Sequence, residues 1–488
     1  MAAALAAALL CAGFAACGNY RGMPGTDPSN PGGVTPEETT YEIDFNLPIG
    51  TTTEISVIIP DNDYERAIMG ALIEGFNQVY PNITVNVNTL VINNYNETIM
   101  RQYNADVLAD VIWCNSQNFY FLVGNGYALN LNGFIEQGEA AGEFDYDVDF
   151  TEDFQNMGVL SGARFSVPRS IDSVVCFYNK GLLTAAGVDM SVIQNGWTWE
   201  TFLSVCQQVR EYYDNPTAPE DPEDYNNPWV LQQAQPNYFP VDANLGWESV
   251  AYPIIRSLGG EVLNEQGDFA LTESASAEIV SFVQNLVTNH YVPTAGEQTS
   301  SFESGTGAFL FQSTSLENYA SRQLLQYYGT NEPAFDIVSF PLINGADSKI
   351  GMGYAGYALN SRLDDEGKDP VQLSAAALFL NYLMSYDGQQ KAAGDGQLTL
   401  PSIRSDLSFE NTDANWHKEF SDTFNVEAYT WGSQYKLREE FLDHTSAVFT
   451  SDLIAAMNAY VGTDAVRDPQ NAFTRFREEV EYVFDSII

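Results

Sequence analysis

The most evident shortage in this 488-residue sequence is of basic side chains. Only 20 residues are Lys or Arg, against 65 Asp or Glu, so the formal net charge is −45. Charged residues make up 17% of the chain, where about 25% is usual, so the imbalance arises mainly from missing cations. Nucleic acids and anionic lipid headgroups are bound through clustered Lys and Arg. The composition therefore argues against both and favours neutral or cationic small molecules as partners.

Histidine and cysteine are also scarce. The histidines are His290, His417 and His444. They lie far apart, without Cys or acidic partners at metal-ligand spacing, so neither a zinc site nor histidine-based catalysis is expected. The cysteines after Cys17 are Cys114, Cys176 and Cys206. Each lies in an apolar or helical context, which predicts buried thiols rather than a disulfide framework.

Long apolar runs are missing beyond the N-terminus, since no later segment has 18 uninterrupted apolar residues. Residues 1–17 end in "FAAC" after an Ala-rich stretch of signal-peptide length, and they resemble a bacterial lipobox in which Cys17 becomes lipidated. No Lys or Arg precedes this stretch, so we expect that Met1 is not the true start. Residues 18–53 begin with a stretch rich in Gly, Pro, Ser and Asn, which predicts a flexible tether.

From residue 54 the pattern alternates between strands and helices. "EISVII" predicts a buried strand, and Asn62 or Asp63 would cap the following helix, which Pro81 stops. "ITVNVNTL" and "DVIW" predict the next strands, so parallel pairing through crossover helices is expected. Further strands are expected at 174–178, 334–342 and 354–360, and further helices at 179–187, 199–213 and 373–383. A chain of this length should form at least two lobes.

Motifs of enzyme chemistry are few. "GMGYAG" matches a dinucleotide-binding pattern, but it runs into a strand rather than a helix. "DYDVDF" spaces Asp145, Asp147 and Asp149 as in a calcium loop, yet Phe150 replaces the required Gly, so a solvated acidic loop is expected. No G-x-S-x-G or P-loop is present. Carboxylate pairs for glycoside hydrolysis remain open because such residues can be distant in sequence.

Several stretches, taken in order, resemble one family. They are "GALIEGFNQVYPNITVNV", "ADVIWCNSQNFYFLVGNGYALNLNGFI", "GARFSVPRSIDSVVCFYNKGLLTAAGV" with "WTWETF", "FESGTGAFLFQ" and "AAALFLNYLMSYDGQQKAAGDGQLTLPSIRS". Their order and spacing from about residue 54 to about residue 405 are similar to the extracellular solute-binding proteins, family 1. These are the sugar-binding subunits of ABC importers, and maltose-binding protein is a member.

The resemblance implies a two-lobed α/β fold of the periplasmic-binding-protein type (type II), each lobe a mostly parallel sheet flanked by helices, with the ligand cleft between the lobes. Lobe 1 would comprise residues 54–172 and 340–400, and lobe 2 residues 173–339 and 401–488. The resemblance implies no cofactor, no metal and no enzymatic activity.

The resemblance also implies cleft residues. Arg169 and Asp172 precede the strand at which the chain would first cross between lobes. Ligands of open α/β sheets bind beyond the carboxyl ends of the strands, within reach of these two side chains. They could instead form a structural ion pair. The other implied contacts are Asp61, Asn62, Trp113, Asn115, Gln117, Trp247, Tyr252, Thr314, Ser315 and Tyr354. Trp113 could also be a packing residue, as we expect of Trp199.

The favoured function is a lipid-anchored, extracytoplasmic sugar receptor of a bacterial ABC importer, monomeric and working with the importer's permease subunits. Aromatic rings stack on a pyranose face, and planar polar side chains pair with its hydroxyls. Two alternatives stay open: a receptor of the same fold for a peptide, a polyamine or a metal chelate, and a secreted glycan hydrolase.

Overall fold

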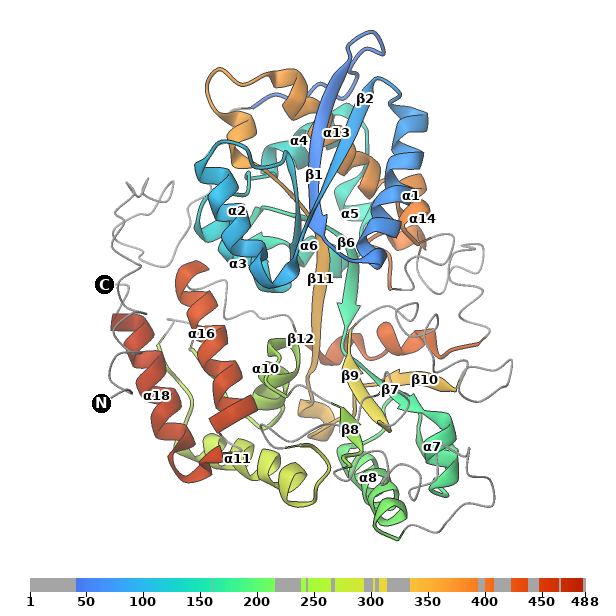
Figure 1. The fold of residues 1–488 in the computed structure, drawn as a ribbon, viewed down its shortest axis with the longest axis vertical. Helices are drawn as coiled ribbons and strands as arrows, with labels where there is room; N and C mark the ends of the chain where they lie inside the picture. Colours follow the sequence, from blue (N-terminus) through green and yellow to red (C-terminus); the bar gives the residue numbers. More distant parts are fainter. Residues whose placement is uncertain are drawn as a thin grey trace, which may run out of the picture.

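A computed structural model of the protein describes residues 41–160, 162–215, 238–242, 245–264, 268–293, 302, 307–313, 334–393, 400–407, 423–437, 447–464 and 467–485. Cys17 and the expected signal peptide lie outside these residues. Two main sheets organise the described chain, one in the upper and one in the lower part of the view in Figure 1.

The larger sheet carries the strands that follow one another early in the sequence. Its strands are β1 (Thr53–Pro60), β2 (Ile83–Leu90), β3 (Val111–Asn115), β6 (Val167–Ser173), β11 (Ile350–Leu359) and β12 (Lys436–Leu437). β1 lies between β2 and β3 and is parallel to both, as the alternating pattern predicts. The second half of β1 is wholly buried, which its apolar run requires.

The smaller sheet has the order β10-β7-β9-β8. Its strands are β7 (Val175–Asn179), β8 (Val241–Asp242), β9 (Phe309–Gln312) and β10 (Phe335–Ser339). A separate hairpin pairs β4 (Val159–Leu160) with β5 (Ala163–Arg164).

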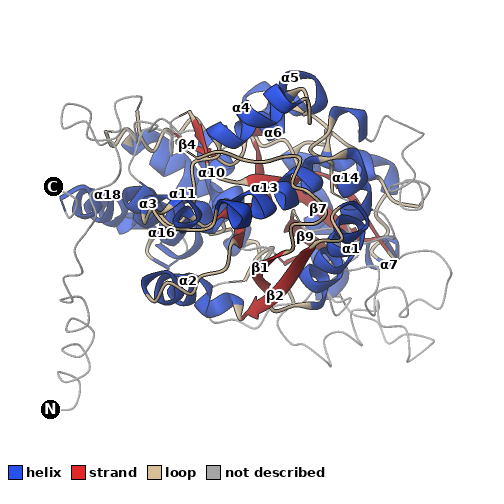
Figure 2. Cartoon of the chain, turned by 90° about the horizontal axis from the view of Figure 1, so that it is seen from above, coloured by secondary structure: helices blue, strands red, loops and turns tan. Residues whose placement is uncertain are grey.

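Helices surround both sheets, as the view from above shows (Figure 2). They are α1 (Asp63–Val79), α2 (Tyr95–Asn104), α3 (Ser116–Gly124), α4 (Asn132–Ala141), α5 (Tyr146–Asp149), α6 (Glu152–Asn156), α7 (Lys180–Ala185), α8 (Trp199–Asp214), α10 (Glu248–Ser257), α11 (Glu273–Thr288), α13 (Pro370–Met384), α14 (Tyr386–Ala393), α16 (Ala447–Ala459) and α18 (Pro469–Asp485). Of the two caps expected for α1, Asn62 is the one that forms, and Thr198 caps α8. None of the helices in the described part of the chain is long and apolar enough to cross a bilayer.

Two strands connect the sheets. β6 belongs to the larger sheet and ends at Ser173, and β7 begins the smaller sheet at Val175. The chain returns through β11, which pairs antiparallel with both β6 and β3. Figure 1 shows β6 and β11 running side by side from one sheet toward the other. The first crossing therefore lies at the "SIDSVV" segment, as the resemblance implies.

One detail of the expected fold needs correction, because the smaller sheet is mostly antiparallel rather than mostly parallel. In the smaller sheet β7 pairs antiparallel with both β9 and β10, and only β8 and β9 are parallel. In the larger sheet three of the five strand pairings among the described residues are parallel, as expected, and the two antiparallel ones are those of β11 with β3 and β6. The physical reason is topological, because a strand that leaves a sheet and one that returns to it run in opposite directions. The expected acidic loop also differs, since Tyr146–Asp149 forms the short helix α5 with Asp145 as its cap.

The core residues include the aromatic and sulfur side chains that the sequence assigns to packing. Trp199 is buried against the rings of Phe202 and Phe282, with centroids 4.8 Å away in each case, so its predicted packing role is confirmed. Cys114, Cys176 and Cys206 are buried free thiols. Burial raises the pKa of Cys114 to about 12, so this thiol stays protonated at neutral pH.

Helix α16, near the C-terminus, packs against helices from distant parts of the sequence. α16 contacts α3, which follows a strand of the larger sheet, and it also contacts α10 and α18. The segment 400–407 contacts the first part of the chain, because Phe150 and Arg404 form an isolated antiparallel bridge. The lobe boundaries stated above remain predictions.

Candidate functional site

A cavity of about 540 Å³ lies where the two sheets and helix α10 meet. The larger sheet supplies residues of β3, β6 and β11 to its wall, and the smaller sheet supplies residues of β8 and β9. The carboxyl ends of β3 and β6 open onto this space, which is where open α/β sheets bind ligands. The cavity is within the usual range for small-molecule sites, about 300–1,000 Å³.

The end of β3 brings an aromatic ring and two small polar residues to the cavity. Asn115 ends the strand and caps α3, because its side chain accepts a hydrogen bond from the Asn118 backbone N–H at 2.9 Å. Trp113 is 6% exposed, and Tyr95 meets its ring edge-on at a centroid distance of 5.6 Å. Its indole Nε1–H is buried with no hydrogen-bond partner among the described residues. A donor left in this state at a cavity wall can bind an acceptor on a ligand.

A buried ion pair forms another part of the wall. The Arg169 guanidinium on β6 donates two hydrogen bonds to the Glu65 carboxylate in the first turn of α1, one of them at 2.8 Å and the other shorter. Burial alone would lower the pKa of Arg169, but Glu65 outweighs this effect and the pKa is raised well above its ordinary value. The ion pair considered for Arg169 therefore exists, and its partner is Glu65 rather than Asp172.

Asp172 lines the cavity from the end of β6, with its side chain partly exposed. The Ser170 hydroxyl donates a hydrogen bond to its carboxylate at 3.3 Å. Burial raises the pKa of Asp172 to about 7, although Arg169 and the hydrogen bond from Ser170 act to lower it. Near neutral pH this carboxyl group therefore exists in both protonation states.

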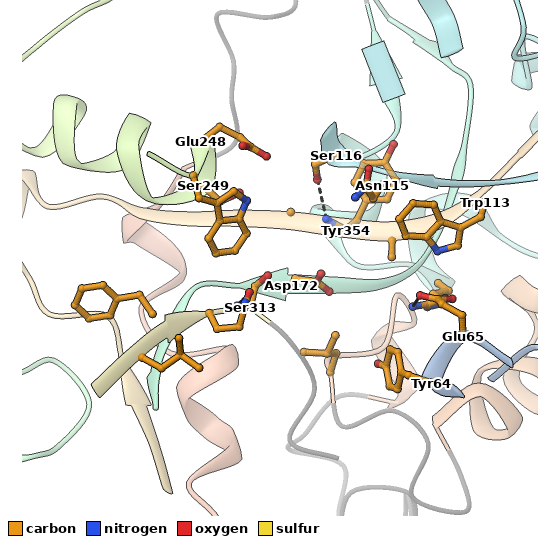
Figure 3. Close-up of a pocket in the computed structure, with 18 of the residues that line it drawn as sticks. Tyr64, Glu65, Trp113, Asn115, Ser116, Asp172, Glu248, Ser249, Ser313 and Tyr354 are labelled. Carbon is orange, nitrogen blue, oxygen red and sulfur yellow. Dashed lines mark hydrogen bonds and ion pairs between the residues drawn. The ribbon is translucent and has the colours of Figure 1, made fainter. Parts of the chain in front are cut away.

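Helix α10 closes the opposite side, where Trp247, Glu248 and Ser249 line the cavity at its start. The helix lies close to β11 because Gly351 has no side chain. A Cβ atom there would clash with the Ser249 carbonyl oxygen. The glycines of "GMGYAG" thus allow close packing. Glu248 is 3% exposed, and its Oε1 has no hydrogen-bond partner among the described residues. Figure 3 shows its carboxyl group pointing from the helix toward the side on which Ser116 lies.

The central strand of the site is β11, and its Tyr354 is held at both ends by neighbouring hydroxyl groups. The Tyr354 backbone N–H donates a hydrogen bond to the Ser116 hydroxyl at 2.9 Å (Figure 3). Its phenol group shares a 2.8 Å hydrogen bond with Ser166, and burial raises its pKa well above the ordinary value. Tyr354 therefore lines the cavity as a neutral side chain fixed by its neighbours.

The structure brings six of the residues that the sequence nominates to the cavity wall: Trp113, Asn115, Arg169, Asp172, Trp247 and Tyr354. Three others do not line it. Asp61 forms an exposed ion pair with Arg66, Asn62 caps α1, and Tyr252 is buried within α10. The side chain of Gln117, and Thr314 and Ser315 altogether, lie outside the described residues.

Sequence reasoning missed several wall residues: Tyr64, Glu65, Ser116, Asp242, Glu248, Ser249, Gln312 and Ser313. Glu248 and Ser249 directly follow Trp247, and Ser116 follows Asn115. The sequence signal that could have found these three residues was therefore their position next to a nominated residue. In the described part of the chain, no group of three or more His, Cys, Asp and Glu residues is arranged to hold a metal ion.

The sequence matches one protein family over most of its length. A family model described as bacterial extracellular solute-binding protein matches residues 71–418. No curated protein matches the sequence.

Solved structures of similar fold include the GacH receptor of Streptomyces glaucescens, studied unliganded and with acarbose. It is 15% identical with a TM-score of 0.64, over 89% of this chain and 98% of that chain. The T. maritima MalE3 structure with maltose bound is 16% identical with a TM-score of 0.61, over 88% of this chain and 99% of that chain. UgpB from Mycobacterium tuberculosis, in complex with glycerophosphocholine, is 14% identical with a TM-score of 0.66, over 89% of this chain and 99% of that chain. At these identities the likeness shows the fold, and the expected two-lobed α/β class is confirmed.

Proposed function

The chain belongs to the bacterial extracellular solute-binding protein family, and we propose that it is the sugar receptor of an ABC importer. Membership implies an extracytoplasmic location and a binding protein rather than an enzyme. In the proposed function, the cavity takes up a sugar or oligosaccharide and the loaded receptor, a monomer, delivers it to the permease subunits of the importer. Maltose in MalE3 and acarbose with the GacH receptor are ligands of this chemical class.

The observation that carries the proposal is the chemistry of the cavity wall. Trp247 and Tyr64 offer aromatic surface, and a pyranose has an apolar face of C–H groups that packs on such rings. The indole N–H of Trp113 and the carboxylate Oε1 of Glu248, each without a partner among the described residues, supply a donor and an acceptor. A sugar hydroxyl can serve either of them, because it both donates and accepts. An apolar ligand would leave both groups buried and unsatisfied.

The signal to the permease would be closure of the lobes around the ligand. A ligand that contacts both sides of the cavity binds the closed state more tightly and so shifts the population toward it. Residues from both sheets line this cavity, and β6 and β11 run between the sheets. In the proposed mechanism, these two strands act as the hinge.

The first test is a thermal-melt screen of the chain after Cys17 against mono- and oligosaccharides, with amino acids, polyamines and peptides as controls. A ligand at 100 times its dissociation constant adds about 2.7 kcal/mol to the free energy of unfolding. Stabilisation by a sugar class without product formation, checked by chromatography, supports the receptor. Stabilisation by a control alone, or release of a hydrolysis product, contradicts it.

Variants locate the site. Trp247→Ala should weaken sugar binding by about tenfold or more, since it removes stacking surface. Asp172→Ala should abolish binding while the fold persists. Trp431→Ala is a matched control, because Trp431 stacks on Tyr435 away from the cavity wall. Unchanged affinity in both cavity variants would reject the assignment.

Membrane attachment is part of the proposal. Lipidation of Cys17 would anchor the receptor, and residues 18–53 would act as the tether. Cys17→Ser should shift the protein from the membrane fraction to the medium in the cells that produce it. Retention of the variant at the membrane would contradict the anchor.

A further inference from the structure

The charged residues of the cavity wall are mostly acidic. They are Glu65, Arg169, Asp172, Asp242 and Glu248. Arg169 is the sole cation among the described wall residues, and its guanidinium is already bound to Glu65. Asp172 and Glu248 therefore form no ion pair with any cation of the described wall. A neutral ligand that fills the cavity would leave this negative charge in place.

These two carboxylates are also poorly satisfied by hydrogen bonds. The Asp172 carboxylate accepts a hydrogen bond from the Ser170 hydroxyl at 3.3 Å, which is long for two oxygen atoms. Oε1 of the 3%-exposed Glu248 accepts no hydrogen bond from the described residues. Withdrawing a carboxylate from water without a partner is unfavourable. The wall thus presents the buried carboxylate of Glu248, and closure on a ligand would also desolvate the partly exposed Asp172.

A cationic group on the ligand would relieve both deficits. A protonated amine has three N–H donors and a positive charge, so it can satisfy Oε1 of Glu248 and neutralise a carboxylate. Trp247 precedes Glu248 directly in the chain and lines the same cavity. The face of an indole ring attracts cations when solvent is excluded.

The wall also requires an acceptor on the ligand. The Trp113 indole N–H can only donate a hydrogen bond, and it is buried without a partner among the described residues. A fully protonated polyamine has no acceptor for it. A sugar has ring and hydroxyl oxygens that can accept this hydrogen bond. The donor and the acidic groups together therefore favour one molecule that carries both oxygens and an amine.

We propose that the ligand is an amino sugar, a saccharide with a free protonated amine that is neutralised by Glu248 and Asp172 while a sugar oxygen accepts the Trp113 N–H. This inference rests on the proposed sugar-receptor function and specifies its ligand. An N-acetylated sugar does not meet the requirement, because acylation removes the positive charge. Hydroxyl-only sugars leave the carboxylates without a counter-charge.

Calorimetry with matched ligands tests the inference. The chain after Cys17, which contains every described residue, is titrated with glucosamine, N-acetylglucosamine and glucose, each as monomer and as α- and β-linked dimer and trimer, and with spermidine. At neutral pH the glucosamine series should bind at least about tenfold more tightly than the glucose series of the same linkage. This preference should fall as the pH rises through about 8, because an amine flanked by electron-withdrawing C–O groups loses its proton near the pKa of an α-amino group.

Variants connect the preference to the carboxylates. Glu248→Gln keeps the side-chain size and removes the charge, so it should lose more affinity for the glucosamine series than for the glucose series. Glu211→Gln on the exposed face of α8 is the matched control and should change neither. A smaller amine preference in the first variant alone supports the inference. An unchanged preference overturns the role of Glu248.

The remaining outcomes separate this inference from the proposed function. If the glucose or N-acetylglucosamine series binds as tightly as the glucosamine series, the amino-sugar inference fails and the sugar receptor stands. If spermidine alone binds, or if no saccharide binds, both fail.

Discussion

Replacing Asp172 with asparagine should stabilise the unliganded protein at alkaline pH. Burial raises the pKa of this carboxyl group from 3.8 to about 7. Between these values the folded chain binds more protons than the unfolded chain, so the free energy of unfolding falls as pH rises from about 4 to about 7. Above pH 7 the destabilisation stays constant. An asparagine side chain at this position carries no charge at any pH and would avoid this loss of stability.

The magnitude follows from the size of the shift. Each pKa unit corresponds to about 1.4 kcal/mol, so a rise from 3.8 to about 7 sets an upper limit of about 4 kcal/mol. Asp172 is partly exposed in the cavity, and solvent screens its charge. The groups that face it are Arg169, which lowers the pKa, and Glu65, which raises it, and the cavity also holds Glu248. We therefore expect Asp172→Asn to gain about 1–3 kcal/mol at pH 8 after this screening.

Urea unfolding at pH 4, 6 and 8 measures the effect, since the midpoint reports stability when the slope is unchanged. The variant and the original protein should be alike at pH 4 and diverge as pH rises. Asp147→Asn is the matched control, because Asp147 is exposed on α5 and its replacement should leave the stability unchanged. A variant that is less stable at pH 8, or a difference that does not change with pH, refutes the reasoning. The same variant should bind ligand more weakly.

Two further predictions concern the Arg169–Glu65 pair and the contact of β11 with α10. Glu65→Gln leaves the Arg169 guanidinium buried without its counter-ion, which should lower the free energy of unfolding by about 3–5 kcal/mol. The double variant Glu65→Leu with Arg169→Met should recover most of this loss. Urea unfolding measures both, and a double variant as unstable as the single one would contradict the prediction. Gly351→Ala places a methyl group against the Ser249 carbonyl, so it should lower stability by about 1–3 kcal/mol and also weaken ligand binding. Gly70→Ala on α1 is the control, because a Cβ atom at this position has no other atom within 4 Å, so the variant should raise the free energy of unfolding by about 0.5–1 kcal/mol. Equal effects of the two glycine variants on stability would show that the contact of Gly351 with α10 does not matter.

The sequence predicts the first sheet well because its signals are local. The apolar run of β1, the cap at Asn62 and the alternation of β2 each depend on neighbouring residues only, and each of these elements forms where it is expected. Strand direction in the smaller sheet was not predictable in the same way. Its central strand β7 pairs with β9 and β10, which come more than 100 residues later in the chain. Pairing at that separation leaves no local pattern.

The residues of the cavity wall were predicted best where they follow a strand of known direction. Trp113, Asn115 and Asp172 lie at the carboxyl ends of β3 and β6, and all three line the cavity. On α10 the prediction was less successful. Trp247 lines the cavity, but Tyr252 does not. Tyr252 comes five residues after Trp247, which corresponds to one full helical turn plus about 140°. The two side chains therefore leave the helix in different directions. Choosing between them requires the position of the helix against β11.

Glu248 shows why binding residues escape sequence reasoning. A glutamate in the first turn of a helix is a common and favourable choice, because its charge interacts with the helix dipole. Nothing in the sequence signals that this one is 3% exposed and that its Oε1 lacks a partner among the described residues. Gly351 creates that environment, since it lets α10 lie against β11. A carboxylate held in such a position makes the unliganded protein less stable than it could be, and a ligand that satisfies the carboxylate recovers the difference on binding. Stabilising substitutions at Asp172 and Glu248 should therefore be the ones that weaken binding, whereas substitutions that weaken the Arg169–Glu65 pair should lower stability and binding together.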